Sequence, residues 1–468
     1  MGYNFIECNR EQIYLLPPSM RDWLPEGDLS WFIIDAVNKM DLSEFYRKYR
    51  PDGRGQAAFE PSMMVSLLLY AYSNGVRSSR TIEKLCERDI SYRVISANTA
   101  PDHSTICRFR QENEEKVTGL FIEVLKLCSK AGLVKVGVVS LDGTKIKANA
   151  SLSSNREYEH IKEEVKKMLT EAEVKDKEED VLYGKDKRGD ELPKELRSRK
   201  SRLARLEECK KLLDEEAKEK ALNQEEKIKT RQAEEAETGK KKRGRKPKAP
   251  KTEPEKETKA NTSDPDSRIM KTRSGYVQGY NAQAAVTEEQ IIIAAELTQE
   301  ANDVKQLHPM IEKAQENLKA IGKSKDRQKI KALTADAGYF SEGNISKITE
   351  KTPELYIAVS KDWKQRKAIG ENSAPRGRIP KDMNTSERME RKLITKRGKA
   401  IYKKRGQTVE PVFGQIKTIR SSDRFMRRGE EACASEWKLL CATHNLLKLW
   451  RRSVQNKQKE QIKSGIWS

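Results

Sequence analysis

The sequence contains few of the residues that usually bind zinc or act as catalytic bases. Only four of its 468 residues are histidines, and His103, His160, His308 and His444 lie far apart. The seven cysteines are odd in number and scattered, and none forms a Cys-x-x-Cys pair. This pattern indicates neither a disulfide framework nor a zinc ribbon, so we expect most cysteines to be small core residues. Any metal chemistry must therefore rest on carboxylates.

Long hydrophobic runs are also absent. No apolar segment approaches the length of a bilayer span, and the first ten residues contain Glu7 and Arg10 where a secretory peptide would be apolar. We therefore expect a cytoplasmic protein with no membrane partner.

The chain carries an excess of positive charge. It carries 93 lysines and arginines against 72 acidic residues, a formal net charge of +21 and a pI near 9.4. This balance indicates a polyanionic partner, and without a membrane segment the expected polyanion is nucleic acid. The length predicts about three domains.

Three acidic residues stand in distinctive contexts. Asp142 lies in Val-Val-Ser-Leu-Asp-Gly-Thr, Asp336 in Leu-Thr-Ala-Asp-Ala-Gly-Tyr, and Glu410 in Gly-Gln-Thr-Val-Glu-Pro-Val-Phe-Gly. The apolar runs 134–141 and 330–335 predict buried strands that Asp142 and Asp336 end, and Glu410 is expected to open a helix. Carboxylates just beyond buried strands are well placed to hold a hard divalent cation.

The N-terminal part, residues 59–133, has a helical pattern. Residues 79–86 predict one helix, Ala-Pro-Asp at 100–102 a turn, and a second helix capped by Asp102, Ser104 or Thr105. Arg108 and Arg110 would project from this second helix. The arrangement resembles a helix-turn-helix unit that reads a major groove. The alternative is a helical bundle with solvated arginines, and the net charge favours DNA contact.

A charged segment, residues 155–261, interrupts the chain. Ile161, Val165, Met168 and Leu169 line one helical face, and leucines at 196, 203, 206 and 213 keep a heptad-like spacing in a second helix. Together they predict an antiparallel helical hairpin with its turn at 184–193. A solvated charged helix without a specific partner is the alternative interpretation.

A basic stretch, residues 240–251, follows the hairpin. Its Arg243-Gly-Arg245 core resembles an AT-hook, in which arginines lie in a narrow minor groove, although Lys246 intervenes before Pro247. The alternative is a flexible basic linker that attracts phosphate nonspecifically.

The remaining pattern predicts a mixed sheet flanked by helices. Residues 276–286 and 290–297 alternate as a hairpin, 303–318 and 341–350 are expected to be helical, and 355–359 predict a further strand. Asp303 is interpreted as a helix cap, and Trp437 and Trp450 as core residues of a long C-terminal helix.

Taken together, the contexts of Asp142, Asp336 and Glu410, with Tyr402 and Arg405 before Glu410 and Lys417 after it, resemble the DDE transposases of bacterial insertion sequences. They are most similar to the branch with a Tyr-Arg-Glu-Lys pattern around the last acid. The resemblance spans roughly residues 57–450. One departure is that four residues lie between Arg405 and Glu410, where the pattern has three. The role of Arg405 is therefore less certain than that of Glu410.

The resemblance implies a ribonuclease-H-like core and two Mg²⁺ ions, for which Mn²⁺ substitutes, held by Asp142, Asp336 and Glu410. It implies cutting and joining of double-stranded DNA at the terminal inverted repeats of a mobile element, and a homodimer on DNA. Such a protein would be nucleoid-associated. Tyr402 could stack on a displaced nucleotide, and Arg405 and Lys417 would contact DNA. Glu410 and Lys417 are seven residues apart and would share one helix face.

The expected organisation is a helical DNA-binding domain (1–133), a catalytic domain in two parts (134–154 and 262–455), the inserted hairpin with its basic linker (155–261) and a basic tail (456–468). A catalytically silent DNA-binding or repressor protein descended from such an enzyme is the alternative function. A structural coiled-coil protein would leave the two aspartate-ending strands unexplained.

Overall fold

The computed structural model describes residues 19–49, 57–168, 194–239, 247, 249–272, 275–322, 329–360, 362–380 and 382–463. Arg243 and Arg245, and the turn expected at 184–193, lie outside the described residues. Within the described ranges, no helix combines the length and the apolar composition needed to cross a membrane.

The N-terminal part is helical, as the sequence predicts. Its elements are η1 (Met20–Asp22), α1 (Leu29–Val37), α2 (Ser43–Tyr46), α3 (Pro61–Ser73), α4 (Ser79–Arg88), α5 (Ile90–Ile95), α6 (His103–Glu112) and α7 (Glu114–Lys130). Proline opens α3 at its first turn, and nearly the whole helix is buried among its neighbours. A hydrophobic core shared with the sheet anchors this helical part.

The expected helix-turn-helix is a three-helix arrangement. The short helix α5 lies between α4 and α6, and α4 packs directly on α6. Asp102 caps α6, since its carboxylate accepts the N–H groups of Ser104 and Thr105 at 2.8 and 3.1 Å. The cap prediction is therefore confirmed, whereas the single turn between two helices is wrong.

A six-stranded mixed sheet forms the centre. Its strands are β1 (Val138–Lys147), β4 (Arg268–Thr272), β5 (Gly275–Thr287), β6 (Ile292–Thr298), β7 (Ala332–Ala335) and β8 (Glu354–Ile357). The order is β4-β5-β1-β7-β8, and β6 also pairs with β5. β5 is antiparallel to β1, β4 and β6, whereas β7 and β8 run parallel to β1. The predicted mixed sheet flanked by helices is confirmed.

The first strand continues past Asp142, so the expectation that this residue ends it is wrong. β1 pairs with β7 only through Ser140, but its antiparallel pairing with β5 continues to Lys147. The long partner β5 satisfies the backbone of the polar residues that follow the apolar run. Asp142 therefore lies within a strand, yet beyond the end of β7.

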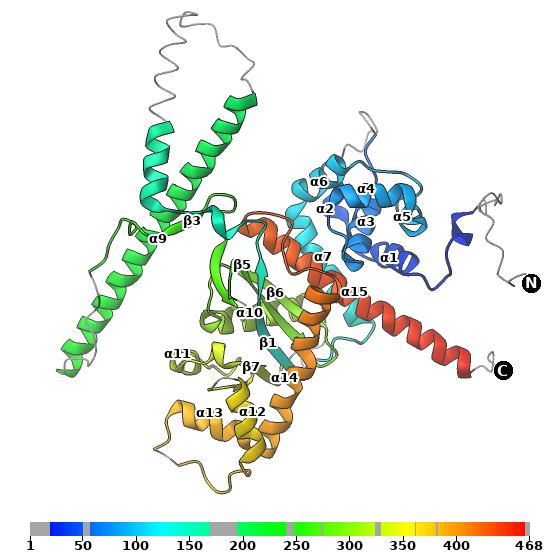
Figure 1. The fold of residues 1–468 in the computed structure, drawn as a ribbon. Coiled ribbons are helices and arrows are strands. Elements are labelled where there is room, and N and C mark those ends of the chain that lie inside the picture. The colour runs from blue at the N-terminus through cyan, green and yellow to red at the C-terminus, as the bar shows by residue number, and fades with distance from the viewer. Residues whose placement is uncertain are drawn as a thin grey trace, which may run out of the picture.

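Helices cover the sheet and connect its parts. They are η3 (Val304–Gln306), α10 (Leu307–Ala320), η5 (Ala337–Tyr339), α11 (Glu342–Ser346), α12 (Asp362–Glu371), α13 (Thr385–Ile394), α14 (Lys396–Gly414), the π-helical η6 (Gln415–Ile419) and α15 (Glu430–Lys463). α14 packs on β1, β5 and β7, whereas α10 and α15 pack on β6. Figure 1 shows α15 passing between the sheet and the N-terminal helices. It buries Trp437 completely, as predicted for a core residue.

Glu410 lies inside α14 and does not open a helix, which corrects the sequence expectation. The helix begins much earlier, where Thr395 caps it by accepting the Gly398 N–H at 3.0 Å. Pro411 has no N–H for the carbonyl of Gln407, one turn before it. The side-chain amide of Gln290 donates to that carbonyl instead, at 2.9 Å. A tertiary contact thus stabilises the proline within the helix.

The charged segment forms two helices that pack on each other, residues 158–168 and α9, as expected for the hairpin, whose turn lies outside the described residues. η2 (Leu152–Ser154) leads into β2 (Asn155–Glu157), which pairs with β3 (Lys259–Asn261), and the long helix α9 (Lys194–Thr238) projects beyond them. Ile161 and Val165 pack with Leu206 and Leu213 in a hydrophobic cluster separate from the main core. Figure 1 shows α9 and the N-terminal helices on different sides of the sheet.

Candidate active site

The sheet register brings the two aspartates side by side. Ser140 of β1 pairs with Thr334 of β7, so Asp142 and Asp336, each two residues later, follow at the same level. β7 ends at Ala335, and the Asp336 carboxylate accepts the Gly338 N–H at 2.9 Å as the cap of η5. The two carboxylates therefore meet at the edge where β7 stops and β1 continues.

A cluster of three buried hydroxyls fixes the level of all three acids. Ser140, Thr334 and Thr408 each stand two residues before an acid. The Ser140 Oγ lies 2.9 Å from the Thr334 Oγ1 and 2.6 Å from the Thr408 Oγ1. These bonds tie β1, β7 and α14 together beneath the carboxylates. The repeated hydroxyl-x-acid pattern is a sequence signal that could have linked the three segments.

Arg405 joins the first and the last acid. Its Nη2 lies 2.8 Å from the Asp142 Oδ2, and its Nη1 lies 3.4 Å from the Glu410 Oε1. The Arg405 side chain is buried, so the guanidinium is desolvated and held between the carboxylates. Arg405 thus faces the acids in this structure, and its contact with DNA stays a prediction.

The site perturbs the ionisation of Asp142. Burial raises the pKa of Asp142 to about 7, the Asp336 and Asp303 carboxylates add to the rise, and Arg405 opposes it. Desolvation thus changes the pKa of Asp142 more than the ion pair with Arg405 does. A buried carboxyl with a raised pKa, beside other acids, is typical of functional sites that bind a cation.

The other residues around Glu410 occupy different surroundings. Tyr402, one turn before Arg405, is buried, and its stacking on a nucleotide stays a prediction. Lys417 lies in η6, where π-helical geometry replaces the expected continuous α-helix. Its ammonium donates to the Thr144 Oγ1 at 3.1 Å and to the Lys145 carbonyl at 2.9 Å. Lys417 therefore reaches the same strand as Asp142.

The two arginines of α6 have different positions. Arg108 is exposed, as expected. Arg110 does not project from the helix, because its guanidinium is buried and donates to the Tyr72 Oη at 2.9 Å and to the Arg77 carbonyl at 3.0 Å. This arginine joins α6 to α3 and to the segment before α4, and DNA contact by the exposed Arg108 stays a prediction.

Asp303 was misinterpreted from the sequence as a helix cap. It precedes η3 but makes no side-chain capping bond. Its Oδ1 accepts the side-chain amides of Asn281 and Gln283 at 2.6 and 2.7 Å, and the Lys145 ammonium lies 3.5 Å away. Asn281 and Gln283 are fully buried polar residues of β5, a strand that is buried from Gln278 to its end. Such polar positions in a buried strand are the signal that could have located Asp303.

The acids form an oxygen donor set, but not a closed metal cage. Within the part of the chain that is described, no three histidine, cysteine, aspartate or glutamate side chains are gathered closely enough to hold a metal ion as they stand. Arg405 supplies the positive charge between Asp142 and Glu410. Carboxylate oxygens are nevertheless the ligands that a hard divalent cation prefers, so the chemistry of the set fits such an ion.

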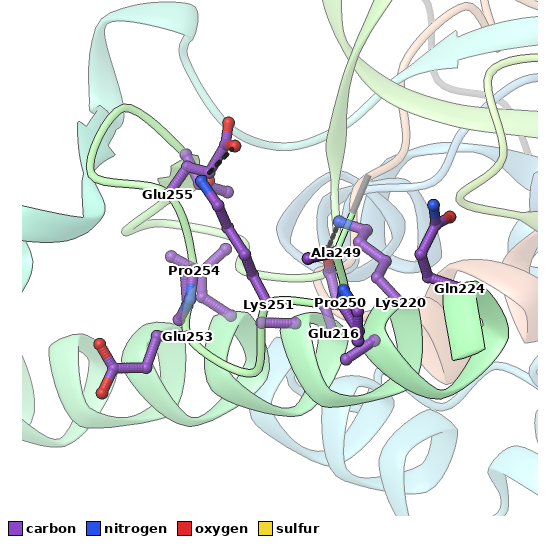
Figure 2. Close-up of a pocket in the computed structure, with 13 residues that line it drawn as sticks. Glu216, Lys220, Gln224, Ala249, Pro250, Lys251, Glu253, Pro254 and Glu255 are labelled. Carbon is purple, nitrogen blue, oxygen red and sulfur yellow. Dashed lines mark hydrogen bonds and ion pairs between the residues drawn. The ribbon is translucent and has the colours of Figure 1, made fainter. Parts of the chain in front are cut away.

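A surface groove lies elsewhere, on the inserted hairpin. It measures about 360 Å³ and is formed where residues 249–258 run along α9. Figure 2 shows Lys251 directed toward Glu255, and Lys220 toward Glu216. Four of its charged residues form these two ion pairs, and Asp142, Asp336 and Glu410 do not line it, so this groove is a packing feature of the linker and not the site of the three acids.

Comparison with protein families is consistent with this geometry. A model described as a transposase domain (DUF772) matches residues 18–112, and one described as a transposase DDE domain matches residues 228–446. These matches support a DDE transposase. The DDE-domain match contains Asp336 and Glu410, whereas Asp142 precedes it. Comparisons with curated proteins and with solved structures find no significant match.

Proposed function

We propose that the protein is an active transposase that cuts and joins DNA at the terminal inverted repeats of a mobile element. The chemistry is phosphodiester hydrolysis by water, followed by attack of the freed 3′ hydroxyl on target DNA. The observation that carries this proposal is the convergence of Asp142, Asp336 and Glu410 at one strand end, around Arg405. A DNA-binding protein without catalysis would not need three converging acids, two of them half-buried, in a chain of positive charge.

Asp142, Asp336 and Glu410 would hold two Mg²⁺ ions, for which Mn²⁺ substitutes. Such ions would activate an attacking oxygen and neutralise a leaving oxygen. The buried surroundings of Asp142 support this role, because a carboxylate destabilised by desolvation gains most from a cation.

Arg405 and Lys417 would assist on the DNA side. The Arg405 guanidinium, which lies between Asp142 and Glu410, would contact a DNA phosphate, which it matches in geometry. Lys417 lies beside Thr144 on the same strand and can address the neighbouring phosphate. These roles agree with a Tyr-Arg-Glu-Lys branch despite the extra residue after Arg405.

The sheet supports a ribonuclease-H-like core. Three antiparallel strands, β6, β5 and β1, continue into two parallel strands, β7 and β8, and the first acid lies on the central strand.

The exposed Arg108 on α6 supports DNA contact by the N-terminal helices. Cleavage at two element ends favours a homodimer on DNA.

The test is a strand-cleavage assay with purified protein, Mg²⁺ and DNA taken from both flanks of the gene. Asp336→Asn keeps the acceptor for the Gly338 N–H but removes the charge, so we expect cleavage to fall by at least about 10³-fold while DNA binding is retained. Asp35→Asn, an exposed position on α1, is the matched control and should cleave normally. Binding without cleavage by both the wild type and Asp336→Asn would support the silent repressor instead.

A further inference from the structure

We propose that Asp303 is a fourth acidic residue of the active centre, which binds a divalent cation together with Asp336. The inference rests on the proposed metal-dependent function. It assigns a role to a residue at the start of η3, far in sequence from the three acids that the motifs identify.

The two carboxylate oxygens of Asp303 have different surroundings. In the described chain, the bonds from Asn281, Gln283 and Lys145 all reach Oδ1, and no bond reaches Oδ2. Gln283 is itself held by the buried Tyr339 hydroxyl, which donates to its side-chain oxygen. The donors fix the orientation of the carboxylate and leave Oδ2 available.

The free oxygen points toward Asp336. A β-carbon built on Gly338 would lie 3.0 Å from the Asp336 Oδ1 and 3.3 Å from the Asp303 Oδ2. Both oxygens therefore border the same small space, which the absence of a side chain at Gly338 keeps open. At Gly143 there is no such room, because a β-carbon there would overlap the Gln283 Nε2 and lie 2.7 Å from the Asp303 Oδ1.

An independent observation points to a ligand here. Among the described residues, the side-chain oxygen of the fully buried Asn281 has no hydrogen-bond partner. It lies 2.9 Å from the position of a Gly143 β-carbon, next to the Asp303 carboxylate, whose Oδ1 lies 2.7 Å from the same position. Buried acceptors without a donor are rare and costly. A cation, or a water bound to one, would satisfy this oxygen and offset the repulsion among Asp142, Asp303 and Asp336.

Metal binding without DNA is the first test. Mn²⁺ is titrated into full-length protein and followed by electron paramagnetic resonance and calorimetry. Asp303→Asn should weaken Mn²⁺ binding by about tenfold or more, because it removes the charge and leaves an amide. Glu300→Gln, an exposed position three residues earlier, is the control and should bind Mn²⁺ as the wild type does.

A second variant covers the case in which Asp303→Asn does not fold. Gly338→Ala would put a methyl group between Asp336 and Asp303 while leaving the bonds from Asn281 and Gln283 intact. We expect the same loss of Mn²⁺ binding. Its control is Gly343→Ala, where the nearest atom to the added carbon is 4.0 Å away.

The outcomes separate this inference from the proposed function. Wild-type Mn²⁺ affinity in both Asp303→Asn and Gly338→Ala, in protein that cleaves DNA, would overturn the role of Asp303 alone. Wild-type protein that binds Mn²⁺ through Asp303 but never cleaves DNA would overturn the proposed function alone. Weakened Mn²⁺ binding with an unchanged melting temperature supports Asp303 as a ligand, because a purely structural role would lower the melting temperature instead.

Discussion

At the scale of single residues, the acids depend on neighbours that carry no charge. Ser140, Thr334 and Thr408 are buried, and their hydroxyls bond to one another from three different elements. Since each precedes an acid by two residues, the cluster sets the relative heights of β1, β7 and α14. The positions of the carboxylates are thus determined one layer below them.

Thr408→Val tests this layer. Valine keeps the shape of threonine but leaves the Ser140 hydroxyl without one partner, so we expect unfolding to require about 1–3 kcal/mol less free energy. We also expect strand cleavage to fall by about tenfold or more, because Glu410 follows on the same helix. Urea denaturation and the cleavage assay measure the two effects.

Thr230→Val provides the comparison. Thr230 lies on the exposed face of α9, where its hydroxyl bonds only to the Glu226 carbonyl of the same helix. Its replacement should change stability by no more than about 0.5 kcal/mol. Equal effects at Thr230 and Thr408 would contradict a positioning role for the hydroxyl cluster.

At the scale of elements, the sequence predicted which segments form strands and helices better than where they end. Apolar runs located β1 and β7, but the end of β1 depends on β5, whose residues are more than a hundred positions away in the chain. Glu410 beside Pro411 suggested a helix start, yet the Thr395 cap and the amide of Gln290 allow α14 to pass through the proline. Element ends are decided by tertiary partners that no local pattern reveals.

The same reasoning explains which site residues the sequence could identify. Asp142, Asp336 and Glu410 stand in recognisable local contexts, so they could be proposed together. Two other features arise only from folding. Arg405 contacts Asp142 and Glu410, and Asp303 accepts the side-chain amide of Asn281 on β5. Local spacing made Asp303 resemble a cap because it also stands directly before a helical turn.

A double-mutant cycle between Gln290 and Pro411 tests the helix. Gln290→Ala removes the amide that bonds the Gln407 carbonyl, so it should destabilise the protein. In the Pro411→Ala background the helix regains its own N–H donor for that carbonyl. The cost of Gln290→Ala should therefore be about 1 kcal/mol smaller there, as measured by denaturant unfolding.

The cycle subtracts the other contacts of Gln290. Its backbone carbonyl bonds His444 and its side-chain oxygen bonds Lys448, but both contacts are the same in the two backgrounds. Identical costs in both backgrounds would show that the amide of Gln290 does not stabilise the helix at Pro411.

At the scale of the whole molecule, one shared core joins the N-terminal helices to the sheet, whereas the inserted hairpin has a core of its own. A buried ion pair between Arg77 and Glu436 crosses the first junction at 3.2 Å. The hairpin is joined through the short β2–β3 ladder and an ion pair between Arg268 and Glu216. The N-terminal helices and the acids therefore form one unit, to which the hairpin is an appendage.

Deleting residues 158–258 and joining β2 to β3 with a short glycine-serine linker tests this division. The acids lie outside the deleted part, so we expect Mn²⁺ binding to be unchanged and the melting temperature to shift by only about 2–4 °C. DNA binding should weaken and become less dependent on salt, because the deletion removes the lysines and arginines of residues 240–251. Thermal unfolding and salt titrations of DNA affinity measure these changes.

A second variant separates the hairpin from its charge. It keeps the hairpin and replaces the lysines and arginines of residues 240–251 with serine. If the basic stretch supplies phosphate contacts, both variants lose the same part of the salt dependence. Each neutralised phosphate contributes about 0.9 to the slope of log affinity against log salt concentration.

A preference of the wild type for A·T-rich DNA that is removed by Arg243→Ala alone would favour the AT-hook interpretation over a nonspecific linker. An unchanged salt slope in both variants would mean that DNA runs along the N-terminal helices and the acids without touching this segment.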